Sequence, residues 1–145
     1  RPPLVGWIGT ATDIDAQKRA ALELAEREAL LEGVLAASDA LVYAKDRDGR
    51  YLVCNDAAAR FFARPARELI GRDIDGELLT PDDLAVIRAI DRGVMDGGAT
   101  RRVEEALVVP GFDGGPTRRT YWSVKSPLRD ASGAVIGIVG VSNDI

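Results

Sequence analysis

The last strand-like stretch of the sequence, residues 133–145, constrains the fold most, because a shorter copy of it occurs near the start. Both copies alternate apolar with small residues, and four identities recur at a spacing of 131 residues: Gly6, Gly9, Asp13 and Ile14 match Gly137, Gly140, Asp144 and Ile145. We consider this repeat first, because a fold predicted without recognising an internal repeat has the wrong architecture. Because the spacing is that of a domain, we interpret residues 1–14 as the final strand of an upstream domain. A chance similarity of two glycine-rich strands is the alternative.

Residues 15–37 predict a long amphipathic helix, because they are dense in strong helix formers, and Asp13 or Asp15 can cap its start. A stripe recurs at alternating steps of three and four, with one charged member: Ala21, Leu24, Glu28, Leu31 and Leu35. Such a stripe requires a partner surface, either the same helix in a second chain or the outer face of the following sheet. We expect a homodimer through Ala21, Leu24, Leu31 and Leu35. Burial of the last two turns against their own domain is the alternative.

Residues 38–145 show two strand signals, then several helical pieces, then three strand signals. Strands are expected over residues 40–46, 50–54, 100–109, 118–128 and 134–145, with hairpin turns that include residues 111–116. Asn55 and Thr80 stand at helix N-cap positions, Gly97-Gly98 ends the second of these helices, and residues 72–79 are expected to be irregular. This order predicts an α+β domain with one antiparallel sheet and a helical layer on one face.

The composition excludes several kinds of chemistry. The 145 residues contain no histidine, which excludes a His-ligated haem, a Ser-His-Asp triad and a His-containing zinc site from this segment. The single cysteine, Cys54, excludes an internal disulfide, and the net charge of −4 gives no signature of nucleic-acid binding. No apolar run approaches the ~20 residues that cross a bilayer, so we expect a cytoplasmic segment without direct membrane contact. Because residue 1 is Arg, the segment looks excised from a longer chain.

Two carboxylate pairs resemble acid–base sites: Asp82 with Asp83, and Asp73 with Asp75. The first pair falls at a predicted helix start and the second in a predicted loop, where the helix dipole and turn formation account for acidic residues. We therefore expect no catalytic residue, no metal site and no enzymatic activity in this segment.

Four stretches of the sequence are distinctive in combination: KDRDGRYLVCN (45–55), ELIGR (68–72), PDDLAVIRAIDRGVMDGG (81–98) and KSPLRDASGAVIGIVGVSNDI (125–145). Through them the chain resembles PAS domains from about residue 34 onward. This resemblance implies a PAS-like five-stranded antiparallel sheet with helices on one face that enclose a small pocket, preceded here by the long N-terminal helix. Residues 4–15 resemble the end of an upstream PAS domain. The implied division is a strand remnant over 1–14, a linker helix over 15–37 and a PAS domain over 38–145.

Comparison with flavin-binding relatives, counting back from Pro127, implies that one face of the strand over 118–128 lines the pocket. The implied pocket residues are Tyr43, Phe61, Ile74, Leu84, Ile87, Glu105, Tyr121, Ser123, Lys125 and Ser142. A charge that faces a closed cavity is costly without a partner. Lys125 therefore pairs with Glu104 or Glu105, or awaits an anionic ligand. If the opposite face of this strand points toward the helices, Trp122 and Val124 line the core instead.

The resemblance implies a sensory module of signal transduction, as in two-component systems. It would bind a small ligand or mediate homodimerisation, and relay a signal to adjacent PAS or output domains such as a histidine kinase or a diguanylate cyclase. Asp144 and Ile145 would pass the signal to the next helix, as Asp13 does upstream. A ligand-free dimerisation and relay module is the alternative.

No cofactor is expected, although an unidentified small ligand, including an anionic one, stays open. Flavin photochemistry is a remote alternative, because Ile74 follows Ile70-Gly71-Arg72-Asp73 where photoactive family members carry cysteine. Haem sensing is equally remote, because the usual histidine ligand is absent.

Overall fold

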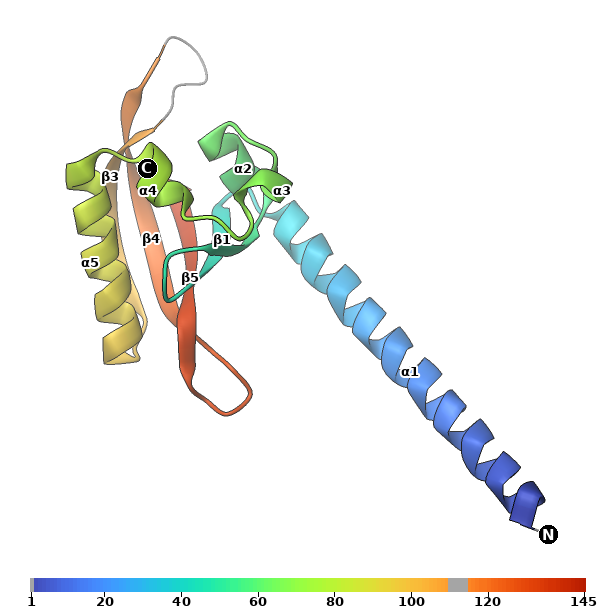
Figure 1. Ribbon diagram of the computed structural model, residues 1–145. Coiled ribbons are helices and arrows are strands. Elements are labelled where there is room, and N and C mark those ends of the chain that lie inside the picture. Colours follow the sequence, from blue (N-terminus) through green and yellow to red (C-terminus); the bar gives the residue numbers. More distant parts are fainter. Residues whose placement is uncertain (1, 110–114) are drawn as a thin grey trace. The chain divides into compact units, whose positions relative to one another are not determined.

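The computed structural model describes residues 2–109 and 115–145, with side chains described from Asp13 onward (Figure 1). The chain divides into two compact units, Arg1–Ala37 and Ser38–Ile145. Most of the turn predicted at residues 111–116 lies outside the described residues.

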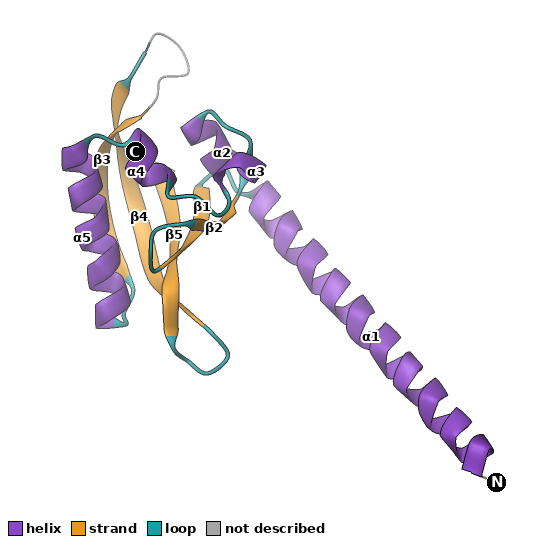
Figure 2. Cartoon of the chain, in the orientation of Figure 1, coloured by secondary structure: helices purple, strands orange, loops and turns teal. Residues whose placement is uncertain are grey.

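The first unit is one continuous helix, α1 (Pro2–Ala37), which runs through Gly33 without a break (Figure 2). The helix predicted over residues 15–37 is present, but the strand predicted over 1–14 is wrong. Asp13-Ile14 is helical, unlike Asp144 at the end of a strand. A strand needs a neighbouring strand for its backbone hydrogen bonds, and the described sheet pairs with no part of this segment. Extending an existing helix instead adds one hydrogen bond per ordered residue. That these residues belong to an upstream PAS domain stays a prediction.

The second unit contains the predicted antiparallel sheet. Its five strands are β1 (Leu41–Asp46), β2 (Tyr51–Cys54), β3 (Arg101–Val109), β4 (Thr117–Arg129) and β5 (Val135–Asp144). They lie in the order β2-β1-β5-β4-β3, so the last strand occupies the centre of the sheet. Strand β5 pairs with β1 on one side and with β4 on the other. Any displacement of β5 therefore acts on both halves of the sheet.

Four helices connect β2 to β3 and cover one face of the sheet: α2 (Asp56–Phe62), α3 (Ala66–Leu69), α4 (Ile74–Leu78) and α5 (Pro81–Gly97). The two predicted N-caps are confirmed. Asn55 Oδ1 accepts from the amide of Ala58 at 3.0 Å, and Thr80 Oγ1 accepts from the amide of Asp83 at 3.2 Å. These bonds satisfy amides that a helix start otherwise leaves unpaired. Helix α5 is capped at its C-terminus by Gly98, whose φ of 65° favours glycine.

Helix α4 corrects the sequence analysis, which expected residues 72–79 to be irregular. Asp73 caps this short helix by accepting from the amide of Gly76 at 3.1 Å, and Ile74 is completely buried. Tertiary burial therefore stabilises a segment whose intrinsic helix propensity is low, since Gly76 lies inside it.

The hydrophobic core lies between the helical layer and the inner face of the sheet. Aromatic rings dominate it: Phe61 contacts Phe62 and Tyr121 edge to face, at centroid distances of 4.8 and 5.5 Å. Tyr51 packs on Phe62 in the same way, at 5.5 Å. The cluster of buried residues comprises Tyr43, Tyr51, Ala59, Phe61, Phe62, Leu69, Ile74, Val109 and Tyr121. This aromatic cluster forms the apolar side of the site described next.

Candidate functional site

The inner face of the sheet carries polar side chains at its centre, where apolar ones are usual. Side chains alternate between the two faces of a strand, so residues two positions apart share a face. The register aligns Tyr43 of β1 and Lys125 of β4 with Gly140 of β5, which lies between them. Ser142 of β5 is aligned with Ser123 of β4 in the same way. The sheet therefore collects polar groups from three adjacent strands at one place.

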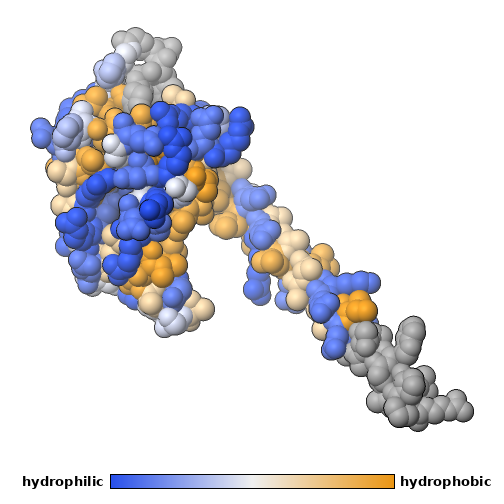
Figure 3. All heavy atoms as spheres, in the orientation of Figure 1, coloured by the Kyte–Doolittle hydropathy of each residue, from blue (hydrophilic) through white to orange (hydrophobic). Residues whose placement is uncertain are grey.

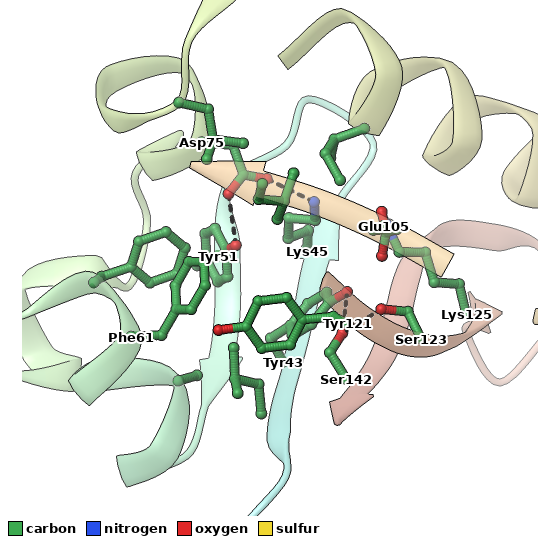
Figure 4. A pocket seen from close by; sticks show the side chains of 16 residues that line it. Tyr43, Lys45, Tyr51, Phe61, Asp75, Glu105, Tyr121, Ser123, Lys125 and Ser142 are labelled. Carbon is green, nitrogen blue, oxygen red and sulfur yellow. Dashed lines mark hydrogen bonds and ion pairs between the residues drawn. The ribbon is translucent and has the colours of Figure 1, made fainter. Parts of the chain in front are cut away.

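These groups surround an internal cavity of about 40 Å³ (Figure 4). Its apolar side comes mainly from the helices and includes Phe61, Phe62 and Ile87. Its polar side comes from the sheet and from Asp75 of α4. The full lining is Leu41, Tyr43, Lys45, Tyr51, Ala58, Phe61, Phe62, Asp75, Leu79, Ile87, Glu105, Leu107, Tyr121, Ser123, Lys125 and Ser142. A polar cavity of this size holds a few water molecules or a very small ligand.

Lys125 is fully buried and lies between two carboxylates. Its Nζ donates to Glu105 Oε2 at 2.8 Å and to Asp91 Oδ1 at 2.9 Å. Glu105 comes from the neighbouring strand β3, whereas Asp91 comes from α5 above the sheet. The pairing of Lys125 with Glu105 is one of the alternatives left open by the sequence. The second partner, Asp91, was not anticipated.

Lys45 of β1 extends this network across the central strand β5, on the same face of the sheet. Its Nζ donates to Asp91 Oδ2 at 2.5 Å and to Asp75 Oδ2 at 2.8 Å. The hydroxyl of Tyr51 donates to the remaining oxygen of Asp75 at 2.8 Å. Asp91 therefore bridges the two lysines, and five buried charged side chains form one continuous network: Lys45, Asp75, Asp91, Glu105 and Lys125.

The electrostatics of the network keep both lysines protonated. Burial alone would lower the pKa of Lys45, but the carboxylates of Asp75 and Asp91 outweigh it and raise that pKa above its ordinary value. The pKa of Lys125 is raised in the same manner, against burial, by its neighbours, among them Asp91 and Glu105. Burial opposes the ionisation of Asp91, yet the two lysines hold its pKa below the usual range. The network is thus built from charged groups that stabilise one another.

Hydroxyl groups form a second polar cluster beside the lysines. Ser123 and Ser142 lie 2.7 Å apart through their Oγ atoms, and the hydroxyl of Tyr43 lies 3.4 Å from Ser142 Oγ. The ring of Tyr43 occupies the space that a side chain at position 140 would need, because a Cβ there would collide with it. Glycine at position 140 therefore allows Tyr43 to turn its hydroxyl toward the serines. Burial raises the pKa of Tyr43, so this group is a neutral donor and acceptor.

Eight of the ten predicted pocket residues line the cavity: Tyr43, Phe61, Ile87, Glu105, Tyr121, Ser123, Lys125 and Ser142. Ile74 is buried in the hydrophobic core, and Leu84 is half-buried on α5; neither lines the cavity. Four polar residues of the site were not predicted from the sequence to belong to it: Lys45, Tyr51, Asp75 and Asp91. Lys45 was detectable, because it lies two positions after Tyr43 on the same strand face. That any of these residues contacts a ligand stays a prediction.

The predicted relay residues lie apart from the network. Asp144 accepts from Arg119 Nη1 at 2.9 Å, and the amide of Ile145 donates to the carbonyl of Thr120 at 3.0 Å. Tyr121, one residue further along β4, lines both the cavity and a surface groove that includes Arg119, Asp39 and Asp144. Leu41 and Phe61 also line both, so three side chains separate the cavity from the groove at the end of β5. Asp13 lies within α1.

Among the described residues, no three His, Cys, Asp or Glu side chains are grouped so that they could hold a metal ion. Cys54 is half-buried at the end of β2, and burial raises the pKa of its thiol, which makes the reactive thiolate less available. In the described part of the chain, no helix combines the length and hydrophobicity needed to cross a membrane.

The sheet, its helical cover and the internal polar cavity define a single-sheet α+β domain that encloses a site. A family model described as PAS fold matches residues 35–145. The chain therefore belongs to the PAS fold family, and the matched residues, a PAS sensory domain, contain the predicted five-stranded sheet.

Two curated relatives are each 33% identical to this chain. One is the methanogenesis regulatory histidine kinase FilI of Methanothrix harundinacea (strain 6Ac), matched over 104 residues. The other is a diguanylate cyclase of Vibrio cholerae serotype O1 (strain ATCC 39541 / Classical Ogawa 395 / O395), matched over 105 residues. Each match covers 72% of this chain, but only 11% and 32% of the respective relative.

Solved structures share the fold at lower identity. The PAS domain of an HTR-like protein from Haloarcula marismortui has a TM-score of 0.64 at 19% identity, over 88% of this chain and 99% of that one. VqmA bound to DPO has a TM-score of 0.63 at 23% identity, over 73% of this chain and 52% of that one. At these identities the similarity establishes the fold alone.

Proposed function

We propose that this PAS domain is a sensory input module, in which the occupancy of the internal cavity is relayed through β5 to an output domain. The observation that carries the proposal is the collection of Tyr43, Ser123 and Ser142 around a cavity at the centre of the sheet. Buried hydroxyl groups with adaptable hydrogen bonds suit recognition of a small molecule. The ligand would be very small, since the cavity of about 40 Å³ is well below the ~300–1,000 Å³ of usual ligand pockets.

The relay would run along β5. Ser142 faces the cavity, and Asp144 follows it by two residues at the surface, where it pairs with Arg119. Tyr121 offers a second connection, because it borders both the cavity and the surface groove next to Asp144. A ligand acts on the output only if it binds two arrangements of these residues with different affinity.

The output domain would be of the kind found in the relatives, a histidine kinase or a diguanylate cyclase. Helix α1 would form a homodimer through Ala21, Leu24, Leu31 and Leu35, which lie on one stripe of the helix. Leu24 and Leu31 are 58% and 54% exposed, although Leu22 and Leu30, outside the stripe, are exposed as well. On the face that Figure 3 displays, hydrophilic and hydrophobic residues are interspersed along the described part of α1. The proposed dimer would therefore depend on a narrow apolar seam, which consists of Ala21, Leu24, Leu31 and Leu35.

A ligand-free dimerisation and relay module is the second candidate. It is favoured by the completeness of the charge network, because every buried side-chain nitrogen and oxygen of the described residues has a hydrogen-bond partner without any ligand. In that case the cavity would hold only water, and dimer packing alone would move β5.

A thermal-stability screen of the whole chain against a broad library of small polar molecules separates the two candidates. Molecules that bind only the folded state raise the melting temperature. The sensor proposal expects at least one such molecule, and expects the effect to vanish in a Ser123→Leu variant whose added side chain fills the cavity. A library with no effect on the unmodified chain would favour the ligand-free module.

A further inference from the structure

The buried charge network contains one more negative charge than positive charges. It holds two lysines, Lys45 and Lys125, against three carboxylates, those of Asp75, Asp91 and Glu105. All five side chains lie at most 10% exposed, so water screens the imbalance poorly. Each lysine already contacts two carboxylates, so its positive charge is compensated within the network.

The surroundings do not supply the missing positive charge. A second cavity, of about 160 Å³, borders the network and is lined in part by Lys45, Asp75 and Asp91. The rest of its lining is balanced in charge, with three arginines and three aspartates. Arg88 pairs with Asp73, and Arg47 lies 4.0 Å from Asp96. The negative excess of the network therefore persists on its solvent side.

Hydrogen-bond capacity is unbalanced in the same direction. Two ammonium groups supply six N–H donors, whereas three carboxylates offer about twelve acceptor positions. Two of the acceptors, Asp75 and Glu105, border the core cavity. Aromatic rings, whose faces attract positive charge, border it as well. Lys45 Nζ already lies over Tyr43 and Tyr51, at 5.6 and 5.7 Å from their ring centroids, and Tyr121 adds a third ring.

We infer that the internal cavity of about 40 Å³ binds a small cation or a small uncharged hydrogen-bond donor, and that it rejects anions. The inference rests on the proposed function that this cavity binds a ligand, and it reverses the anionic ligand left open by the sequence. Acetamidinium, acetamide and acetate provide a test, since they are planar, have four non-hydrogen atoms each and differ in charge.

The experiment titrates each of the three compounds into the uniformly labelled whole chain at neutral pH and constant ionic strength, and follows the backbone amide signals of Ser123 and Ser142. Acetamidinium is expected to shift these signals saturably and to bind at least tenfold more tightly than acetate, with acetamide between them. Acetate binding as tightly as acetamidinium would overturn the charge preference and leave the proposed ligand binding intact. No saturable shift with any compound would overturn both.

A matched pair of variants isolates the source of the preference. Glu105→Gln removes the excess charge while keeping the shape of the side chain, so the ratio of acetamidinium to acetate affinity should fall at least fivefold. Glu104→Gln removes the same charge from the adjacent, exposed position on the outer face of β3 and should leave the ratio unchanged. An equal effect of both variants would contradict the inference. If Glu105→Gln does not fold, the titrations of the unmodified chain still decide the question.

Discussion

Lys125 Nζ on strand β4 lies 2.9 Å from Asp91 Oδ1 on helix α5, and this contact ties the sheet to the helix that covers it. The other oxygen of Asp91 binds Lys45 on β1, which is separated from β4 by β5. One helical carboxylate thus spans the central strand. This arrangement connects the polar side of the site, and Tyr51 of the aromatic cluster joins it by donating its hydroxyl to Asp75.

Replacing Lys125 by methionine should destabilise the domain by about 3–5 kcal/mol, because it leaves Asp91 and Glu105 buried with one lysine fewer. Urea denaturation measures the change. The control is Arg102→Met on the neighbouring strand, where an exposed charge is lost and the expected change is within about 0.5 kcal/mol. The double variant Lys125→Met/Glu105→Leu should recover part of the loss. Equal stability of Lys125→Met and Arg102→Met would contradict a stabilising role of Lys125 in the charge network.

Gly140→Ala should destabilise the domain by about 1–3 kcal/mol, because the added Cβ collides with the Tyr43 ring. Gly97→Ala, in the last turn of α5, meets no atom within 4 Å and should be neutral or stabilising by up to about 1 kcal/mol. Thermal denaturation of both variants gives the comparison. A Gly140→Ala variant as stable as Gly97→Ala would contradict the close packing of the Tyr43 ring against position 140 of β5.

Much of the fold could be predicted from the sequence, because local signals and tertiary packing agree there. The caps at Asn55 and Thr80 placed their helices correctly. Alternation along β4 left two possible inward faces, and only the family resemblance favoured the one with Lys125, which lines the cavity. The site was predicted less completely. Asp75 and Asp91 reach the network from helices, and strand alternation contains no information about which helical residues lie opposite. The strand predicted over 1–14 was wrong, since the repeat alone cannot supply the neighbouring strand that it needs.

The free energy of unfolding should fall steeply above about pH 10. Burial raises the pKa of the Tyr43 and Tyr51 hydroxyls, and Lys45 and Lys125 also have raised pKa values, through their charged neighbours and against burial. All four groups keep their protons in the folded state where the unfolded chain loses them. Each therefore lowers stability by up to about 1.4 kcal/mol per pH unit above its unfolded pKa of about 10.

Urea denaturation at a series of alkaline pH values measures this dependence, with the ultraviolet absorbance of phenolate as an independent signal. We expect phenolate to form together with unfolding, as the pKa of Tyr121 is also raised by burial. Phenolate that forms while the domain is still folded, or stability that stays constant above pH 10, would contradict the burial of these hydroxyl groups.

Leu24→Glu and Leu31→Glu should convert a dimer of the whole chain to a monomer, because each places a charge in the proposed apolar seam of α1. Leu22→Glu and Leu30→Glu introduce the same charge outside the seam and should leave the dimer intact. Sedimentation equilibrium gives the masses. If all four variants have the mass of the unmodified chain, α1 is not the interface.

The ionised state of the network can be measured directly on its lysines. The chain contains only three, the exposed Lys18 and the buried Lys45 and Lys125, so side-chain nitrogen NMR resolves each of them. With Lys18 as the reference within the molecule, the signals of Lys45 and Lys125 should stay those of charged ammonium groups at every pH at which the domain is folded. Loss of a proton from either lysine near neutral pH, as burial without compensation would cause, would contradict a cavity wall built from mutually stabilised charges.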